Sequence, residues 1–206
     1  INAGSSSLKI QLFESERFTC TYKKFVDRID SNYKEALEHI LQDIKTKKII
    51  KAFSEIGLVA NRVVHGGDKY MKPTRITAGV IKDITKLCDL APLHNPANIA
   101  GILACRNIFT HIPQVAIFDT AFHQTLEPKA YLYAIPYEWY KNQAVRRYGF
   151  HGTSHAYLAK TTIKLLGRKT SKIITCHLGN GCSMTAIKNG NAIDTSMGFT
   201  PLEGIP

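Results

Sequence analysis

The sequence predicts an α/β fold with a partly parallel sheet, because short apolar runs typical of strands alternate with stretches of helical periodicity. The predicted strands of the first half are 10–13, 58–64 and 115–118, and the predicted helices are 31–48, 80–90 and 97–109. The length of 206 residues is sufficient for one or two compact domains.

The first strand is expected to begin at Ile1, to break at the turn-rich segment 3–7 and to resume at 10–13. Ser31 is the predicted N-cap of the first helix, which repeats apolar residues at helical spacing. These apolar residues are Tyr33, Leu37, Ile40, Leu41 and Ile44. The segment 91–96 is expected to be an extended loop, because each proline disfavours the α conformation in the residue before it.

A further helix is predicted from Thr153, as its N-cap, to Gly167, whose missing Cβ suits a left-handed helix stop. The segment after it contains three short strands, 173–177, 183–187 and 192–195. Residues 179–181 form a tight turn between the first two, and Asn189-Gly190 is a strong hairpin signal between the last two.

The two ends of the chain follow the same plan of strand, Gly/Ser turn and strand. Setting Gly4 against Gly181 aligns Ser6 with Ser183 and Ile10 with Ile187, which is a weak internal repeat. It predicts two related domains, each with a phosphate-sized turn between antiparallel strands. This is the arrangement of the actin, sugar kinase and heat-shock ATPase superfamily, which has a ribonuclease H-like core.

The composition, 44% hydrophobic and 21% charged residues, is that of a globular protein, and no apolar run is long enough to span a membrane. The sequence opens at Ile1 with no basic n-region followed by an apolar h-region, which leaves open a short leader before Ile1. The five cysteines are odd in number and irregularly spaced, which argues against a disulfide framework or a zinc site and favours a reducing cytoplasm. The net charge of +11 fits an anionic small substrate, a solvated basic surface or nucleic acid. Nucleic acid is disfavoured, since no recognition-helix or aromatic RNA-binding motif is present.

Neither a P-loop nor a dinucleotide-binding glycine motif occurs, so a phosphate site must use hairpin turns. Residues 2–9 offer such a turn: small residues allow backbone N–H groups to approach phosphate oxygens, hydroxyls add donors, and Lys9 adds charge. A plain serine-rich hairpin is the alternative.

Four other side chains are candidates for chemistry. Arg62 interrupts an apolar strand, where it either forms an internal ion pair or faces a cleft and holds a carboxylate or phosphate. Asp119 follows the strand 115–118 at the end where α/β sheets place functional groups, although it could simply cap the turn. His151 and His155 have i, i+4 spacing without the glutamate of a metalloprotease, so His151 is read as a pocket histidine. His177 ends a strand beside the 179–181 turn.

Seven segments, in order along the whole chain, resemble the acetokinase family. They are NAGSSSLK (2–9), RVVHGG (62–67), APLHNP (91–96), FDTAFHQT (118–125), GFHGTSH (149–155), HLGNG (177–181) and DTSMGFTPLEG (194–204). The resemblance implies an ATP-dependent carboxylate kinase, with 1–121 as the N-terminal domain and 122–206 as the incomplete C-terminal nucleotide-binding domain.

The resemblance also implies roles. Asp119, His151 and Arg62 would be catalytic, and Asn2 would help to hold Mg²⁺, with Mn²⁺ as the alternative. The remaining roles fall into two sets. For the substrate, Arg62 would bind the carboxylate or the transferring phosphoryl, and the apolar acyl pocket would consist of Val64, Leu93, Phe150 and Pro201. The phosphates of ATP or ADP would contact Ser5, Ser7, Lys9, His177, Leu178, Gly179, Asn180 and Gly181.

The family pattern continues beyond Gly204 to a second catalytic arginine, the adenosine site and a metal-binding glutamate, so we expect this segment alone to be inactive. Acetate and acetyl phosphate are the expected substrates, in a cytoplasmic homodimer that binds neither nucleic acid nor membranes. A propionate or butyrate kinase, or a non-catalytic nucleotide-binding module, is the alternative. Because a carboxylate is already ionised at pH 7, Asp119 is expected to position a group rather than to remove a proton.

Overall fold

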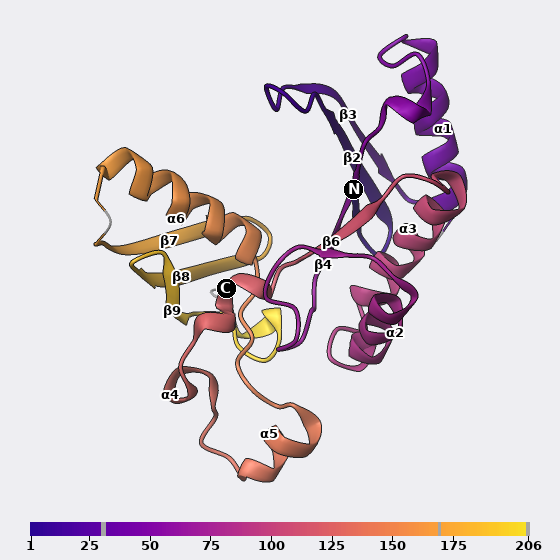
Figure 1. The fold of residues 1–206 in the computed structure, drawn as a ribbon. Helices are drawn as coiled ribbons and strands as arrows, with labels where there is room; N and C mark the ends of the chain where they lie inside the picture. Colours follow the sequence, from indigo (N-terminus) through magenta and orange to yellow (C-terminus); the bar gives the residue numbers. More distant parts are fainter. Residues whose placement is uncertain (30–31, 169, 205–206) are drawn as a thin grey trace. The chain divides into compact units, whose positions relative to one another are not determined.

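The structure is a computed structural model that describes residues 1–29, 32–168 and 170–204 (Figure 1). The chain divides into two compact units, Ile1–Val64 with Pro73–Ile117 and His65–Lys72 with Phe118–Pro206. The chain therefore enters the second unit briefly, returns to the first, and enters the second again at Phe118. The domain boundary predicted after residue 121 stays a prediction.

The first unit is built on a mixed sheet. Its strands are β1 (Asn2–Ala3), β2 (Ser7–Phe13), β3 (Cys20–Asp27), β4 (Val59–Val63), β5 (Thr74–Arg75) and β6 (Gln114–Phe118). The antiparallel ladder β1-β2-β3 lies next to the ladder β4-β6-β5, in which β5 is antiparallel to β6. Ile1 joins the ladders: its nitrogen donates to the carbonyl oxygen of Ala60 at 2.7 Å, and its carbonyl accepts from the Arg62 N–H at 2.9 Å. Ile1 thus bonds to the residues on either side of Asn61, which is the hydrogen-bond pattern of parallel strands. The predicted partly parallel sheet is confirmed.

Helices pack on this sheet. They are α1 (Tyr33–Thr46), α2 (Ala78–Lys86) and α3 (Asn95–Ile108), with the 3-10 turns η1 (Phe53–Glu55) and η2 (Leu87–Asp89). α3 contacts α1, α2, β1 and β4, so it is the central helix of the unit. α1 buries the five apolar residues predicted from its periodicity, and they join the core that β2 and β3 contribute to.

Two predictions about helix starts in this unit need correction. The N-cap of α1 is Asn32, whose side chain accepts from the Glu35 N–H at 3.3 Å, whereas the predicted cap, Ser31, lies outside the described residues. The segment 91–96 is a hydrogen-bonded turn and not an extended loop, because the His94 and Asn95 N–H groups both donate to the Ala91 carbonyl. Pro96 stands in the first turn of α3, where its missing N–H costs nothing.

The second unit contains the antiparallel sheet β7 (Lys172–Leu178), β8 (Cys182–Lys188) and β9 (Asn191–Thr195). Helix α6 (Gly152–Leu166) runs beside this sheet (Figure 1) and contacts β7 and η3 (Ala121–Thr125). The remaining elements are α4 (Pro128–Tyr131), α5 (Tyr137–Gln143) and η4 (Pro201–Glu203). The predicted hairpin is confirmed, since Asn189 and Gly190 both have positive φ, 53° and 85°. The predicted N-cap of α6 is wrong: His151 is the cap and Thr153 is helical.

The internal repeat is present in topology but not in residue register. Both β1-β2-β3 and β7-β8-β9 are antiparallel with neighbouring strands in chain order. However, Ala3 pairs with Leu8 across the first turn, whereas Leu178 pairs with Cys182 across a turn one residue shorter. A single offset such as Gly4 on Gly181 therefore cannot align both strands.

All five cysteines are free thiols. Within the described ranges, none of the helices combines the length and the apolar character that a membrane span requires.

Candidate functional site

The β1–β2 turn of the first unit brings four of the predicted residues to one end of a hairpin. The Gly4 N–H donates to the Ser7 carbonyl at 2.8 Å, and Asn2 is directly opposite Lys9 in the ladder, so their side chains share a face. Ser5 is exposed, and Asn2 and Ser7 are half-buried. An amide, two hydroxyls and an ammonium at one small-residue turn can bind an anion such as a phosphate.

Asn98 on α3, which sequence reasoning missed, ties this turn to the end of β4. Its Nδ2 donates to the Ala3 carbonyl at 2.7 Å, and its Oδ1 accepts from the Val64 N–H at 2.9 Å. The side chain is 3% exposed, so these bonds form away from solvent. Its only sequence signal was a polar residue at a buried position of a predicted helix.

Arg62 and Val64 lie at the end of β4. Arg62 is half-buried on the strand face opposite Asn61 and Val63, both of which are buried. Val64 is 8% exposed, whereas Leu93, in the turn before α3, is 75% exposed. The first unit therefore offers one buried and one exposed residue of the predicted acyl pocket.

In the second unit, His151 lies at a sharp turn that leads into α6. It has the left-handed conformation φ 57°, ψ 22°, which is uncommon for a non-glycine residue. The next residue, Gly152, donates its N–H to the Asp119 carbonyl at 2.8 Å. A Cβ on Gly152 would lie 2.2 Å from that oxygen, so only glycine permits the contact. Asp119 itself is 2% exposed at the end of β6, as the sequence predicted.

His151 and His177 are brought together with the glycine turn. Their rings stack at 4.0 Å between centroids and 26° between planes. A Cβ on Gly181 would lie 3.0 Å from Nε2 of His151, so this edge of the imidazole borders the turn. Leu178, Gly179 and Asn180 are exposed there. The Gly179 N–H donates to the Gly181 carbonyl at 3.3 Å within this turn. The arrangement places imidazole nitrogen beside an exposed glycine turn, which suits an oxyanion.

Phe150 and Pro201 also belong to the second unit. Phe150 is 2% exposed and packs edge-on against His65 at 5.7 Å, and Pro201 is half-buried in η4. Burial lowers the pKa of His65 to about 4. The predicted acyl pocket would combine Phe150 and Pro201 with residues of the first unit, and it stays a prediction.

A buried polar network lies between α6, η3 and the sheet, and the sequence reasoning missed most of it. Thr175, Ser183, Thr185 and Thr195 occupy inward positions of the three strands where apolar residues would be expected. Thr175, Ser183 and Thr185 bond to His155, His151 and His123 at 2.7–2.9 Å. Thr195 bonds to Thr185 at 3.1 Å. The alternation of small hydroxyl residues in β7–β9 was the available signal.

Both buried histidines of this network are neutral at pH 7. Burial lowers the pKa of His123 to about 3, with smaller electrostatic contributions from His155 and His151. Burial lowers the pKa of His155 to about 4, with smaller electrostatic contributions from His151 and His177. Each ring therefore carries a single N–H and can be donor on one side only.

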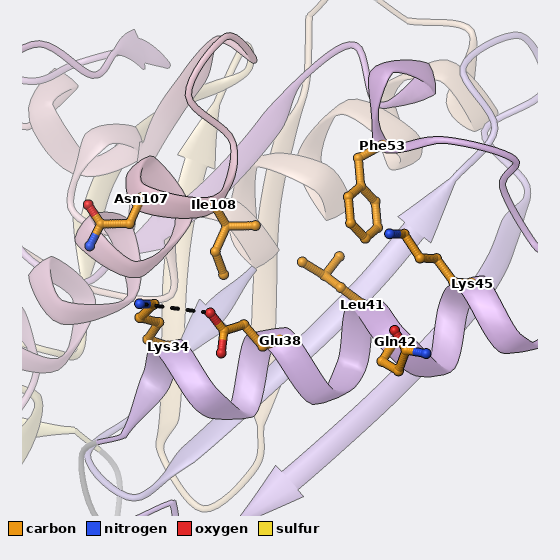
Figure 2. Close-up of a pocket in the computed structure, with 8 residues that line it drawn as sticks. All are labelled: Lys34, Glu38, Leu41, Gln42, Lys45, Phe53, Asn107 and Ile108. Carbon is orange, nitrogen blue, oxygen red and sulfur yellow. Dashed lines mark ion pairs between the residues drawn. The ribbon is translucent and has the colours of Figure 1, made fainter.

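A pocket of the first unit lies away from the predicted site residues. Figure 2 shows this pocket of about 450 Å³ between α1, η1 and α3, where Lys34 and Glu38 form an ion pair at 3.9 Å. Lys45 lies over the Phe53 ring at 4.3 Å. None of the predicted site residues lines this pocket. Among the described residues, no three His, Cys, Asp or Glu side chains are grouped as a metal site.

Comparison with known proteins identifies the family. The family model described as the acetokinase family matches residues 22–206. The chain belongs to the acetokinase family. A curated relative, the acetate kinase of Caldanaerobacter subterraneus subsp. tengcongensis, is 49% identical over 100% of this chain and 58% of its own length.

Two solved structures share the fold. The Porphyromonas gingivalis acetate kinase matches with a TM-score of 0.89 and 39% identity, over 98% of this chain and 57% of its own. The Francisella tularensis propionate kinase matches with a TM-score of 0.89 and 38% identity over the same shares. The chain thus has the α/β fold expected for the acetokinase family and spans a little over half the length of these relatives.

Proposed function

We propose that the protein is an acetate kinase, which transfers the γ-phosphoryl group of ATP reversibly to acetate and gives acetyl phosphate and ADP. The observation that carries the proposal is identity of 46–49% over the entire chain to several relatives named acetate kinase. The grouping of His151, His177 and Gly181 at an open turn supports it, since a nucleotide kinase without a P-loop needs such a phosphate site.

The reaction is an in-line displacement. A carboxylate oxygen forms a bond to the γ-phosphorus as the bond to the β-phosphate oxygen breaks, and ADP leaves with that electron pair. Because acetate is ionised at pH 7, no base is required. The main barrier is the approach of an anion to a polyanion, and positioned donors and cations reduce it.

This chain would supply several of those groups. The Arg62 guanidinium would bind the acetate carboxylate or the transferring phosphoryl through parallel N–H bonds. His151 would donate to a phosphoryl oxygen, and the backbone of residues 177–181 would line the phosphates together with Ser5, Ser7 and Lys9. Asp119 would position the substrate or a bound water. Val64, Leu93, Phe150 and Pro201 would contact the methyl group.

Mg²⁺, or Mn²⁺ in its place, is part of the proposal. Mg²⁺ prefers oxygen ligands and takes few of them from protein, with phosphates and water completing the set. The Asn2 amide oxygen, beside the hydroxyls of the β1–β2 turn, fits that donor chemistry. When bound, the ion would neutralise charge on the phosphates.

The decisive measurement is acetyl phosphate formation by the full-length protein, trapped as the hydroxamate. Arg62→Ala should lower kcat about 10³-fold or more, the scale for an arginine that stabilises this transition state. Arg106→Ala removes an exposed arginine of the same unit and serves as the control. Equal rates for the two variants would refute the role of Arg62, and salt-dependent DNA binding without acetyl phosphate would refute the kinase.

A propionate kinase of the same family is the second candidate, because one such enzyme matches this fold as well as an acetate kinase does. Val64 is β-branched and would narrow the acyl pocket. Val64→Ala should therefore raise kcat/KM for propionate relative to acetate by about 10-fold, the value of one methylene in an apolar pocket. An unchanged ratio would show that Val64 does not line the pocket.

The proposal extends, on family resemblance, to a cytoplasmic homodimer without nucleic-acid or membrane partners. Size-exclusion chromatography with light scattering on the full-length protein would test the dimer.

A further inference from the structure

Four side chains of the second unit form a continuous hydrogen-bonded chain. Oγ1 of Thr175 lies 2.7 Å from Nδ1 of His155, whose Nε2 lies 2.9 Å from Oγ of Ser183. The same Ser183 oxygen lies 2.8 Å from Nδ1 of His151. Thr175 is 5% exposed, and His155 and Ser183 are fully buried. Water therefore has little access to the three residues behind His151.

The number of hydrogens determines the direction of each bond. Among the residues that the structure describes, the Thr175 hydroxyl forms its hydrogen bond with Nδ1 of His155. The hydroxyl hydrogen therefore goes to this nitrogen, and Thr175 is the donor. His155 is neutral and must then carry its hydrogen on Nε2, which donates to Ser183. The Ser183 hydroxyl has one hydrogen, and it is left to donate to Nδ1 of His151.

A second chain on the same sheet obeys the same count. Thr195 donates to the Met184 carbonyl at 3.0 Å and accepts from Thr185 at 3.1 Å. Thr185 must then accept from Nε2 of His123 at 2.9 Å, which leaves Nδ1 of His123 bare. That nitrogen is indeed buried without a partner among the described residues, and a bare nitrogen is less costly there than an N–H.

We propose that Thr175, His155 and Ser183 are positioning residues that hold His151 as the neutral tautomer, with its hydrogen on Nε2 at the edge that borders Gly181. His151 then presents a hydrogen-bond donor to the 177–181 turn without needing a positive charge. A proton added at Nδ1 would require Ser183 and His155 to reverse their bonds and would take the acceptor of Thr175 away. The identity of the acceptor at Nε2, a phosphoryl oxygen, rests on the proposed function, but the tautomer does not.

Other titratable groups lie near these four hydrogen-bonded side chains, and the charge of each would affect the protonation of His151 in a known direction. His177 on β7 stacks on His151, His123 in η3 lies edge-on to His155 at 5.7 Å, and Asp119 precedes η3. A positive charge on His177 or His123 would oppose one on His151, whereas the Asp119 carboxylate would favour it. Ser183 differs from all three because its hydrogen bond is to Nδ1 of His151 alone, so it favours one tautomer over the other.

The test is nitrogen NMR on the full-length protein with ¹⁵N-labelled histidine, since the shift of each ring nitrogen distinguishes a bare from a protonated atom. His151 and His155, assigned through His151→Gln and His155→Gln, should both show a protonated Nε2 and a bare Nδ1 at pH 7. Ser183→Ala removes the donor to Nδ1 of His151. Its tautomer preference should weaken, and its pKa should rise by about 0.5–1 pH unit, the value of one hydrogen bond.

Thr185→Val is the matched control, because it removes a buried hydroxyl two residues along the same strand that bonds to His123 instead. It should leave the His151 shifts unchanged. A hydrogen on Nδ1 of wild-type His151, or an Ser183→Ala variant with unchanged His151 shifts, would overturn the proposal. The wild-type shifts decide alone if Ser183→Ala does not fold. A wild type that forms no acetyl phosphate would contradict the proposed function and leave the tautomer assignment standing.

Discussion

At the scale of single residues, a buried amide can hold two backbone segments in place. Asn98→Ala would leave the Ala3 carbonyl and the Val64 N–H without their partner in a site that is 3% exposed. Each unpaired buried group costs about 1–3 kcal/mol, so with two such groups the free energy of unfolding should fall by about 2–6 kcal/mol. Urea denaturation of the full-length protein measures it.

Asn107→Ala is the control for this prediction, since Asn107 is exposed on the same helix. It should change stability by less than about 0.5 kcal/mol. Equal effects of the two substitutions would show that the Asn98 bonds contribute nothing to stability.

Site residues that belong to a local sequence motif could be predicted from the sequence. Site residues that depend on partners far away along the chain could not. His151, His177 and Gly181 lie in recognisable segments, and the structure places them together. Asn98, His123 and Thr175 acquire their significance only from hydrogen-bond partners that are 20 to 95 residues away along the chain. No local pattern contains that information.

At the scale of elements, the β8–β9 hairpin depends on its two left-handed residues. Gly190 has φ 85°, a conformation that costs an L-residue with a Cβ about 1–2 kcal/mol. Gly190→Ala should therefore lower the free energy of unfolding by that amount, although there is ordinary space for a methyl group, with Ile163 at 3.6 Å. Denaturation of the variant would measure this cost.

Gly57→Ala tests the same change without the conformational demand. Gly57 has nothing within 4 Å of an added Cβ and no positive φ. The substitution should be neutral or slightly stabilising, because alanine reduces the freedom of the unfolded chain. If both variants lost the same stability, the left-handed turn would not be the cause.

Periodicity predicted α1, α2, α3 and the sheet β7-β8-β9, but it missed β3 and α5 and did not predict where helices begin. The buried stripe of α1 came directly from spacing, since only one helical phase buries all five apolar residues. The N-cap of α1 could not be predicted from spacing, because Ser31 and Asn32 are adjacent and both are favoured capping residues. At α6 the cap is His151, which no capping preference favours; the backbone there is set by the Gly152 contact with Asp119.

At the scale of the whole molecule, buried neutral histidines make stability depend on pH. The pKa is lowered chiefly by burial, to about 4 in His65 and His155 and to about 3 in His123. The unfolded chain, with ordinary pKa values near 6.5, therefore binds protons first as the pH falls. This contribution is complete above about pH 6.5 and declines towards pH 3–4, by about 1.4 kcal/mol per pH unit for His123. Carboxylates titrate mainly below pH 5, so the slope between pH 6.5 and 5 isolates the histidines.

His123→Gln should make the slope of stability against pH shallower in this window, whereas His111→Gln, at an exposed site, should leave it unchanged. Urea denaturation at several pH values measures the slopes, and parallel slopes for wild type and His123→Gln would contradict the burial of a neutral imidazole.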